Sequence, residues 1–386
     1  MEWNKLIKDM WKSPDMRKKL EKKLVNRWKT ENPTEVELGQ TREVVTSMFC
    51  NDQHVFCAAL WGIVGVYQLD GQWVRDLTPT ERGPMFVNLA GGEGVLAAWS
   101  DFGVWSVWGI KGLEEDTGFT GFNFDDDDDP DAHSWISTVQ VIDQSKIALL
   151  VVHDMEDHNK VSLVFLKRGE QVWEEKIVAC FPFFPMLAAH GHWVALVDDT
   201  LTTNNEVSKV MLWQEENTGQ DIELPDSERD GCMVRGMVME LPFLALFLYD
   251  CNMTTSVKVY RMAEDKQMKD LSQAASLVKS ISINNFWPMI GPLSNRHFVG
   301  FVHQEVGVRG GMGHVFKKST LFSNSSETGG IQIHLPTRTT SLFSRQIALN
   351  TTSLVFYRRE KDDEGRHYSV LAKKDFWMIK NILPVL

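Results

Sequence analysis

Cysteine is scarce in this sequence, and the few cysteines show no pairing pattern. Only five occur in 386 residues, at Cys50, Cys57, Cys180, Cys232 and Cys251. An odd number without a Cys-x-x-Cys spacing argues against a disulfide framework and fits reduced thiols inside a cell.

Long hydrophobic runs are also missing. No apolar stretch approaches the roughly 18–20 residues that span a bilayer, and Lys5, Lys8, Asp9 and Lys12 interrupt the start of the chain. Neither a transmembrane helix nor a secretory signal peptide is therefore predicted. We expect no membrane partner and a cytoplasmic or nuclear location.

The chain lacks an excess of basic residues. Its formal net charge is −12 and its pI is about 5.4, which argues against a nucleic-acid partner because such proteins usually present a basic face. Residues 1–30 differ from the rest, with ten Lys and Arg against four Asp and Glu. A basic helix face there could touch an acidic partner, or it could simply face solvent.

Catalytic signatures are absent as well. The sequence contains no G-x-S-x-G, no H-E-x-x-H and no set of kinase motifs, and no Ser, His and Asp arrangement can be picked out. We therefore expect no enzyme, and we assign no catalytic, metal-binding or cofactor-binding residue.

Four polar segments could argue against that expectation. His153–Lys160 carries two histidines and three carboxylates that could bind a metal, but a polar loop between two strands is also expected there. Asp125–Asp131 could bind Ca²⁺ or a basic partner, or form a solvated insertion, and it lacks the Gly and Glu of an EF-hand loop. Gly307–Gly313 precedes a strand rather than a helix, as a hairpin tip would. His190 and His192 flank a glycine, as turn residues do.

What the sequence does contain is a recurring hairpin. In Ser100–Trp108, an Asp-Phe-Gly turn precedes a short run of β-branched and aromatic residues, which is typical of a strand after a tight turn. A strand that is apolar on both faces must lie between other sheets. Earlier in the chain, Leu60–Tyr67 repeats the pattern, with Trp61 at the position of Phe102. A period of about forty residues in units made only of strands is typical of a β-propeller.

An apolar residue recurs at the third-strand position of seven successive units. The intervals are 41, 57, 48, 47, 56 and 55 residues, and the positions are Tyr67, Trp108, Phe165, Trp213, Tyr260, Phe316 and Leu371. Six units would leave one apolar cluster over, and eight would be too short for four strands each. We therefore predict an all-β fold, a seven-bladed β-propeller over residues 35–386. Thr34–Gly39 is expected to supply the outer strand of the last blade and so close the ring.

The first 32 residues predict two short helices. Trp3, Leu6, Ile7, Met10 and Trp11 follow the spacing of one amphipathic face. A Ser-Pro-Asp sequence then gives a cap and a new helix start, and the second helix ends before Pro33. These residues form a separate segment in front of the propeller.

Two parts of the chain resemble known families. Ser100–Trp108 resembles the third-strand hairpin of WD repeats, with Trp108 in place and Gly109 where the family has Asp. Trp3–Lys29 resembles the linker helices that join the F-box to the propeller in F-box/WD-repeat proteins, through Trp3, Leu6, Trp11 and the pair Trp28-Lys29. The F-box itself, which would precede this linker, is not in the chain.

The resemblance implies a protein-interaction propeller that serves as the substrate-recognition part of an F-box-type (SCF) ubiquitin ligase. A ligase adaptor and a cullin would be partners only if an F-box lies upstream. Trp61 and Phe102 occupy equivalent turns and are the candidate partner-binding residues, because aromatics are enriched at interface anchors; both could also fold back over the blades. The alternatives are a scaffold with no link to ubiquitin and a propeller hydrolase with a metal or acidic site in its central channel.

Overall fold

The computed structural model describes most of the chain from Glu35 to Asp375. The described ranges are 35–41, 44–59, 62–78, 88–92, 94–100, 105–116, 119, 134–153, 159–169, 174–181, 186–198, 209–214, 222–223, 233–249, 255–262, 275–283, 286–294, 298–305, 311–323, 330–334, 347–349, 353–361, 364 and 367–375. The two helices expected before residue 33 lie outside them.

Seven four-stranded antiparallel sheets hold the described strands. Sheet 1 contains β2 (Val45–Cys50), β3 (His54–Ala59), β4 (Val64–Gln68) and β5 (Trp73–Leu77). Sheet 2 contains β6 (Asn88–Gly92), β7 (Val95–Trp99), β8 (Trp105–Gly109) and β9 (Glu114–Glu115). Sheet 3 contains β10 (Ser134–Asp143), β11 (Lys146–His153), β12 (Asn159–Lys167) and β13 (Glu174–Phe181). Sheet 4 contains β14 (Met186–His190), β15 (Trp193–Asp198), β16 (Lys209–Gln214) and β17 (Ile222–Glu223).

The second half of the chain continues the pattern. Sheet 5 contains β18 (Met233–Glu240), β19 (Phe243–Tyr249), β20 (Thr255–Met262) and β21 (Ala275–Ile283). Sheet 6 contains β22 (Phe286–Ser294), β23 (Phe298–Glu305), β24 (Gly311–Lys317) and β25 (Gly330–His334). Sheet 7 contains β26 (Ile347–Leu349), β27 (Ser353–Lys361), β28 (His367–Asp375) and, from the other end of the chain, β1 (Glu35–Thr41). The one helix in the described residues is α3 (Lys318–Leu321), which follows β24.

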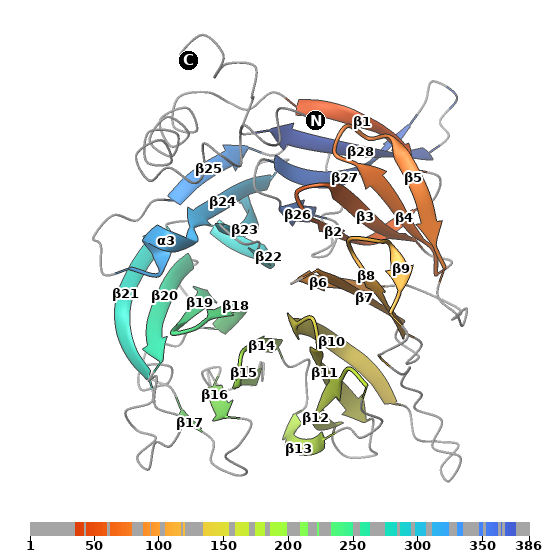
Figure 1. The fold of residues 1–386 in the computed structure, drawn as a ribbon. Coiled ribbons are helices and arrows are strands. Elements are labelled where there is room, and N and C mark those ends of the chain that lie inside the picture. The colour runs from red at the N-terminus through yellow and green to blue at the C-terminus, as the bar shows by residue number, and fades with distance from the viewer. Residues whose placement is uncertain are drawn as a thin grey trace, which may run out of the picture.

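The sheets stand around a common centre, with the first strand of each innermost (Figure 1). In chain order the first strands contact one another, from β2 to β6, β10, β14, β18, β22 and β26, and β26 contacts β2 again. The ring is closed by β1, which pairs with β28 at the outer edge of sheet 7, with Glu35 opposite Lys374 and Thr41 opposite Ser369. This confirms the expectation that the strand near Thr34–Gly39 completes the last sheet.

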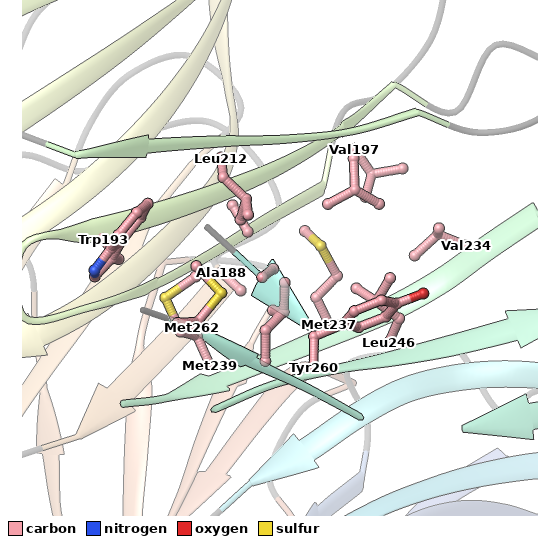
Figure 2. Close-up of a cluster of buried hydrophobic side chains, with 14 of the residues drawn as sticks. Ala188, Trp193, Val197, Leu212, Val234, Met237, Met239, Leu246, Tyr260 and Met262 are labelled. Atoms are coloured by element: carbon pink, nitrogen blue, oxygen red, sulfur yellow. The ribbon is translucent and has the colours of Figure 1, made fainter. Parts of the chain in front are cut away.

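The core lies between neighbouring sheets, as the strand at Trp108 predicts. Successive residues of β8 point to opposite sides, so Trp108 packs between sheets 1 and 2, whereas Val107 packs between sheets 2 and 3. Both side chains are buried. Figure 2 shows the corresponding cluster between sheets 4 and 5, where Trp193 and Leu212 face Met237 and Tyr260. Burying the large side chains of such a cluster stabilises the fold by about 2–3 kcal/mol each.

All seven third-strand positions that the spacing identifies lie on the third consecutive strand of their sheet, from Tyr67 on β4 to Leu371 on β28. Two local predictions from the sequence are wrong. The fifth unit is predicted to end near Leu271, but its outer strand β21 follows at Ala275–Ile283. A strand is predicted over Gly313–Phe322, but β24 ends at Lys317, after which the chain makes the single turn of α3.

One hydrogen bond joins the inner strands of sheets 1 and 2. The buried hydroxyl of Ser47 on β2 accepts the backbone N–H of Leu89 on β6 at 3.1 Å. We expect Ser47→Ala to lower the free energy of unfolding by about 1–2 kcal/mol, because a buried donor is left without a partner. Urea denaturation measures this, with Ser145→Ala in an exposed turn as the control, expected within about 0.5 kcal/mol of the wild type. Equal values for the two variants would contradict the role of this bond.

Candidate functional site

The meander of strands gives the ring two rims. On one side, here the 2–3 rim, each sheet turns from its second to its third strand and the chain passes to the next sheet. On the other side, here the 1–2 rim, each sheet turns from its first to its second strand and from its third to its fourth. Loops at such rims carry the binding residues of many scaffolds.

The candidate residues Trp61 and Phe102 belong to the 2–3 rim by their place in the chain. Both lie outside the described residues, but Trp61 stands between β3 and β4, and Phe102 stands between β7 and β8. The turn after β3 is tight, since the Ala59 N–H donates to the Ile63 carbonyl at 2.9 Å and Gly62 has a φ of +74°. A closed turn of this kind fixes the backbone on either side of the residues that it carries.

A histidine joins three strands of sheet 3 at the same rim. His153, at the end of β11, has its Nδ1 atom 2.8 Å from the Ser134 hydroxyl on β10. Its Nε2 atom is 3.0 Å from the Ser162 hydroxyl on β12. Ser162 is fully buried, and the other two side chains are half-buried. The imidazole therefore connects the two hydroxyls across the sheet and holds the rim of sheet 3 in one conformation.

These contacts give His153 a structural role within sheet 3. The other potential metal ligands of the segment His153–Lys160, from Asp154 to His158, lie outside the described residues, as does Asp125–Asp131. Among the residues described, no group of three or more His, Cys, Asp or Glu could hold a metal ion. Sequence reasoning missed Ser134 and Ser162, because their contacts with His153 depend on the register of β10, β11 and β12, which the sequence pattern did not define.

Nucleophilic chemistry finds little support in Cys50 and Cys57, the cysteines whose side chains the structure describes. Cys50 on β2 and Cys57 on β3 are both buried and free. Burial raises the pKa of each thiol, and for Cys50 the neighbouring Asp52 and Cys57 add to the rise. A thiol kept protonated at neutral pH is a poor nucleophile, so these residues serve packing.

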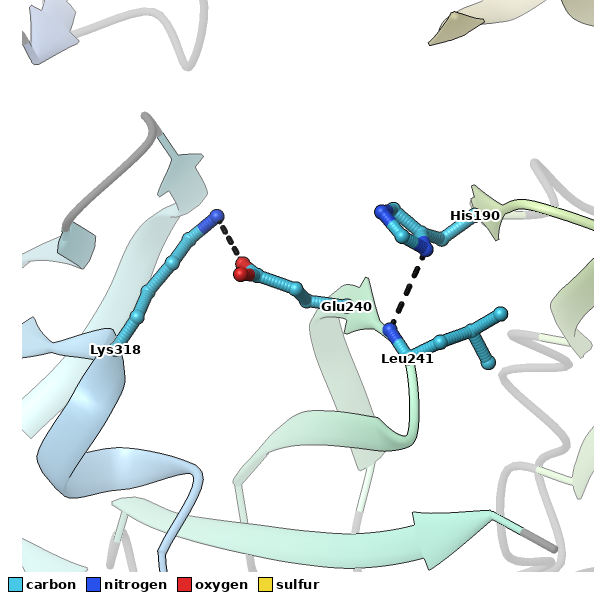
Figure 3. A network of polar contacts seen from close by, with 4 residues as sticks. All are labelled: His190, Glu240, Leu241 and Lys318. Carbon is cyan, nitrogen blue, oxygen red and sulfur yellow. Dashed lines mark hydrogen bonds and ion pairs between the residues drawn. The ribbon is translucent and has the colours of Figure 1, made fainter. Parts of the chain in front are cut away.

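The 1–2 rim carries a chain of polar contacts across sheets 4, 5 and 6 (Figure 3). The Leu241 N–H donates to Nδ1 of His190 at 3.4 Å, which links the turns of sheets 4 and 5. Glu240, beside Leu241, forms an ion pair with Lys318 of α3, the helix that follows β24 of sheet 6. His190 ends β14 immediately before the Gly191-His192 turn, which confirms that the histidine pair flanks a turn.

The described rim residues thus bond to one another rather than converge on a reacting centre. Among the described contacts of this imidazole, Nδ1 meets the Ser134 hydroxyl and Nε2 meets the Ser162 hydroxyl. A serine nucleophile normally relies on a base that a carboxylate orients. The arrangement suits rigid loops that present a surface.

The fold is that of a WD40-type β-propeller. The β-propeller domain of Cps50 (Swd1) from Myceliophteria thermophila matches with a TM-score of 0.52 over 87% of this chain and 99% of that one, at 7% sequence identity. The WD40 repeats of RRP9 match with a TM-score of 0.53 over 89% and 99%, at 12% identity. No protein-family model matches the chain, and a search of curated proteins found no match. At these identities the likeness concerns the fold alone.

Membrane insertion through a helix has no candidate in the described part of the chain. None of its helical residues form a segment of the length and hydrophobicity that crossing a bilayer requires.

Proposed function

We propose that residues 35–386 form a seven-bladed β-propeller that binds a protein partner on its 2–3 rim and performs no catalysis itself. The seven described sheets, the contacts that run from β2 round to β26 and back, and the β1–β28 pairing support a single closed ring. A closed ring has no free sheet edge between its blades and provides a rigid platform for loops.

The recurrence of an aromatic at one turn carries the proposal. Trp61 and Phe102 stand at equivalent places in sheets 1 and 2, and the strands on both sides of each are buried between neighbours. Sheet 3 adds a rim fixed by His153 and its two serines. Two aromatic anchors on adjacent rigid blades are the composition expected of an interface centre.

Within that role, we propose the substrate receptor of an F-box-type ubiquitin ligase. The support is the resemblance of Trp3–Lys29 to the linker of F-box/WD-repeat proteins, with residues 1–32 as that linker. The propeller would hold a substrate at a fixed distance from a partner enzyme and so raise its effective concentration. A cytoplasmic or nuclear location follows from the same proposal and from the free cysteines.

Affinity capture tests the binding surface. The tagged chain and the double variant Trp61→Ala/Phe102→Ala are expressed in cells, and recovered proteins are quantified by mass spectrometry. We expect the recovered amount of specific partners to fall at least about tenfold in the double variant, because each anchor truncation costs about 2 kcal/mol or more of binding free energy. Trp73→Ala is the control, because Trp73 is 42% exposed at the start of the outer strand of sheet 1, on the 1–2 rim side and so opposite to Trp61 and Phe102.

The outcomes separate the general proposal from the finer one. Partners that are lost equally in Trp73→Ala would overturn the 2–3 rim as the binding surface. Recovery of a ligase adaptor and a cullin, retained by the double variant while substrates are lost, supports the ligase role. A gene product that keeps its rim-dependent partners and never recovers adaptor or cullin is a scaffold unrelated to ubiquitin.

A further inference from the structure

The turn after β24 reaches across to sheet 5 and is held there by four different contacts. The α3 residue Leu321 is fully buried in the cluster between sheets 5 and 6. Lys318 pairs with Glu240 of sheet 5, and the ammonium of Lys279 on β21 donates to the Thr320 carbonyl at 2.6 Å. Phe322, directly after α3, stacks on Phe243 with ring centroids 5.6 Å apart and planes inclined by 11°.

The stacked pair stays partly exposed at the 1–2 rim. Phe243 and Phe322 are both half-buried and lie at the edge of the cluster, together with Val278. Next to Phe243, at the directly opposite position on β20, stands Arg261, whose side chain is exposed. Leu244 and Tyr260, the strand neighbours of Phe243 and Arg261, belong to the core cluster between sheets 4 and 5. Because successive residues of a strand point to opposite faces, Phe243 and Arg261 face sheet 6 and α3.

Among the described residues around this pair, the charges are mainly positive. Arg261, Lys279 and Lys318 surround it, and Glu240 is the carboxylate that the described contacts place among them. Desolvation lowers the pKa of Lys279, as expected of an ammonium drawn into a partly buried site. The ammonium of each lysine carries three N–H donors. The Thr320 carbonyl accepts one from Lys279, and the Glu240 carboxylate pairs with Lys318. In a chain with a net charge of −12, such a group differs in sign from the average surface.

We propose that this patch, formed by Phe243, Phe322, Arg261, Lys279 and Lys318, is a second docking surface that takes an acidic peptide with an apolar side chain. The two stacked, half-buried rings provide apolar surface at the rim, and an arginine beside aromatic rings is the composition of interface anchors. The cations complement carboxylates on either side of the apolar residue. The surface lies on the rim opposite to Trp61 and Phe102, so it is independent of the proposed function.

Fluorescence anisotropy with the full chain tests the patch. The probe is a labelled peptide in which a Phe-Leu pair is flanked by three acidic residues on each side. One comparison peptide carries lysines in place of the acidic residues, and another carries Gly-Ser in place of Phe-Leu. We expect binding of the acidic probe alone, weakened by salt because exposed charges contribute.

The protein variants locate the binding. Arg261→Glu is expected to weaken the acidic probe about tenfold, and Phe322→Ala by a similar factor. Arg75→Glu, an exposed arginine on the outer strand of sheet 1, should leave it unchanged. Arg261 is exposed, so its replacement is compatible with folding, which near-UV circular dichroism verifies. Equal binding by acidic and basic probes, or equal effects of the two arginine variants, would overturn the proposal.

Discussion

Gly71→Ala should destabilise the protein by about 3–5 kcal/mol, through a contact that closes the ring. Gly71 lies in the turn between β4 and β5 with a φ of +91°, a region that costs a residue with a Cβ about 1–2 kcal/mol. A Cβ added there would overlap the carbonyl group of Leu38 and stand 2.8 Å from its Cα. Leu38 belongs to β1, so backbone meets backbone and neither side can rotate away.

The control is a glycine with the same backbone demand and open surroundings. Gly169, in the turn after β12, has a φ of +79° and no atom within 4 Å of an added Cβ. We expect Gly169→Ala to cost about 1–2 kcal/mol, the conformational term alone. Urea denaturation at constant m-value measures both variants. If they were equally stable, β1 would not lie against this turn.

Hydrogen exchange can place the effect of Gly71→Ala in the ring. The added methyl pushes on β1, which is held to the rest of the protein by its pairing with β28. Amides of β1 and of β28 should therefore exchange faster in the variant, whereas amides of sheets 3 and 4 should keep their protection. A uniform loss of protection would point to global unfolding instead of a loosened closure.

The repeat was predictable because third strands such as β4 and β8 are buried on both faces. Tyr67 packs between sheets 7 and 1, and Trp108 packs between sheets 1 and 2, so both positions require large apolar residues whatever the loops do. The same constraint explains why the strand at Glu35–Thr41 could be assigned to the last sheet. The outer edge of the last sheet needs a partner strand for its backbone hydrogen bonds, and a strand near the start of the chain provides it.

The outer strands and rims were less predictable because packing constrains them weakly. The outer strand β21 alternates exposed serines with Ile281 and Ile283, and a bulge opposite Val259 and Tyr260 interrupts that alternation. Such a pattern is weak in sequence. The contacts of α3 join residues far apart in the chain, and those of His153 depend on the register of three strands, for which one sequence holds no signal. Trp61 and Phe102 stay predictions, since they lie outside the described residues.

A buried histidine in sheet 6 predicts how stability depends on pH. His314 on β24 is buried, its ring stacked on Phe301 with centroids 5.2 Å apart. Phe301 in turn contacts Phe247 and Phe316, so the imidazole lies in an aromatic cluster. Burial lowers the pKa of His314 from 6.5 to about 4, because the charged ring cannot be solvated there.

Between pH 6.5 and 4 the unfolded chain therefore binds a proton at His314 that the folded chain does not bind. The neutral ring contributes its full stabilisation above pH 6.5, and this contribution, about 3 kcal/mol, is lost as the pH falls toward 4. His314→Phe and His314→Gln cannot titrate. Both should show a shallower fall of stability with acidification than the wild type.

Urea midpoints from pH 7.5 down to 4.5 measure this dependence. Carboxylates titrate in the same range, but their contribution is common to all three proteins, so the difference from the wild type isolates His314. We expect different absolute stabilities for the two variants at pH 7, because Phe keeps the ring contact with Phe301 and Gln does not. The comparison therefore uses only the slopes of stability against pH. Slopes equal to that of the wild type in both variants would show that His314 does not stay neutral in the folded core.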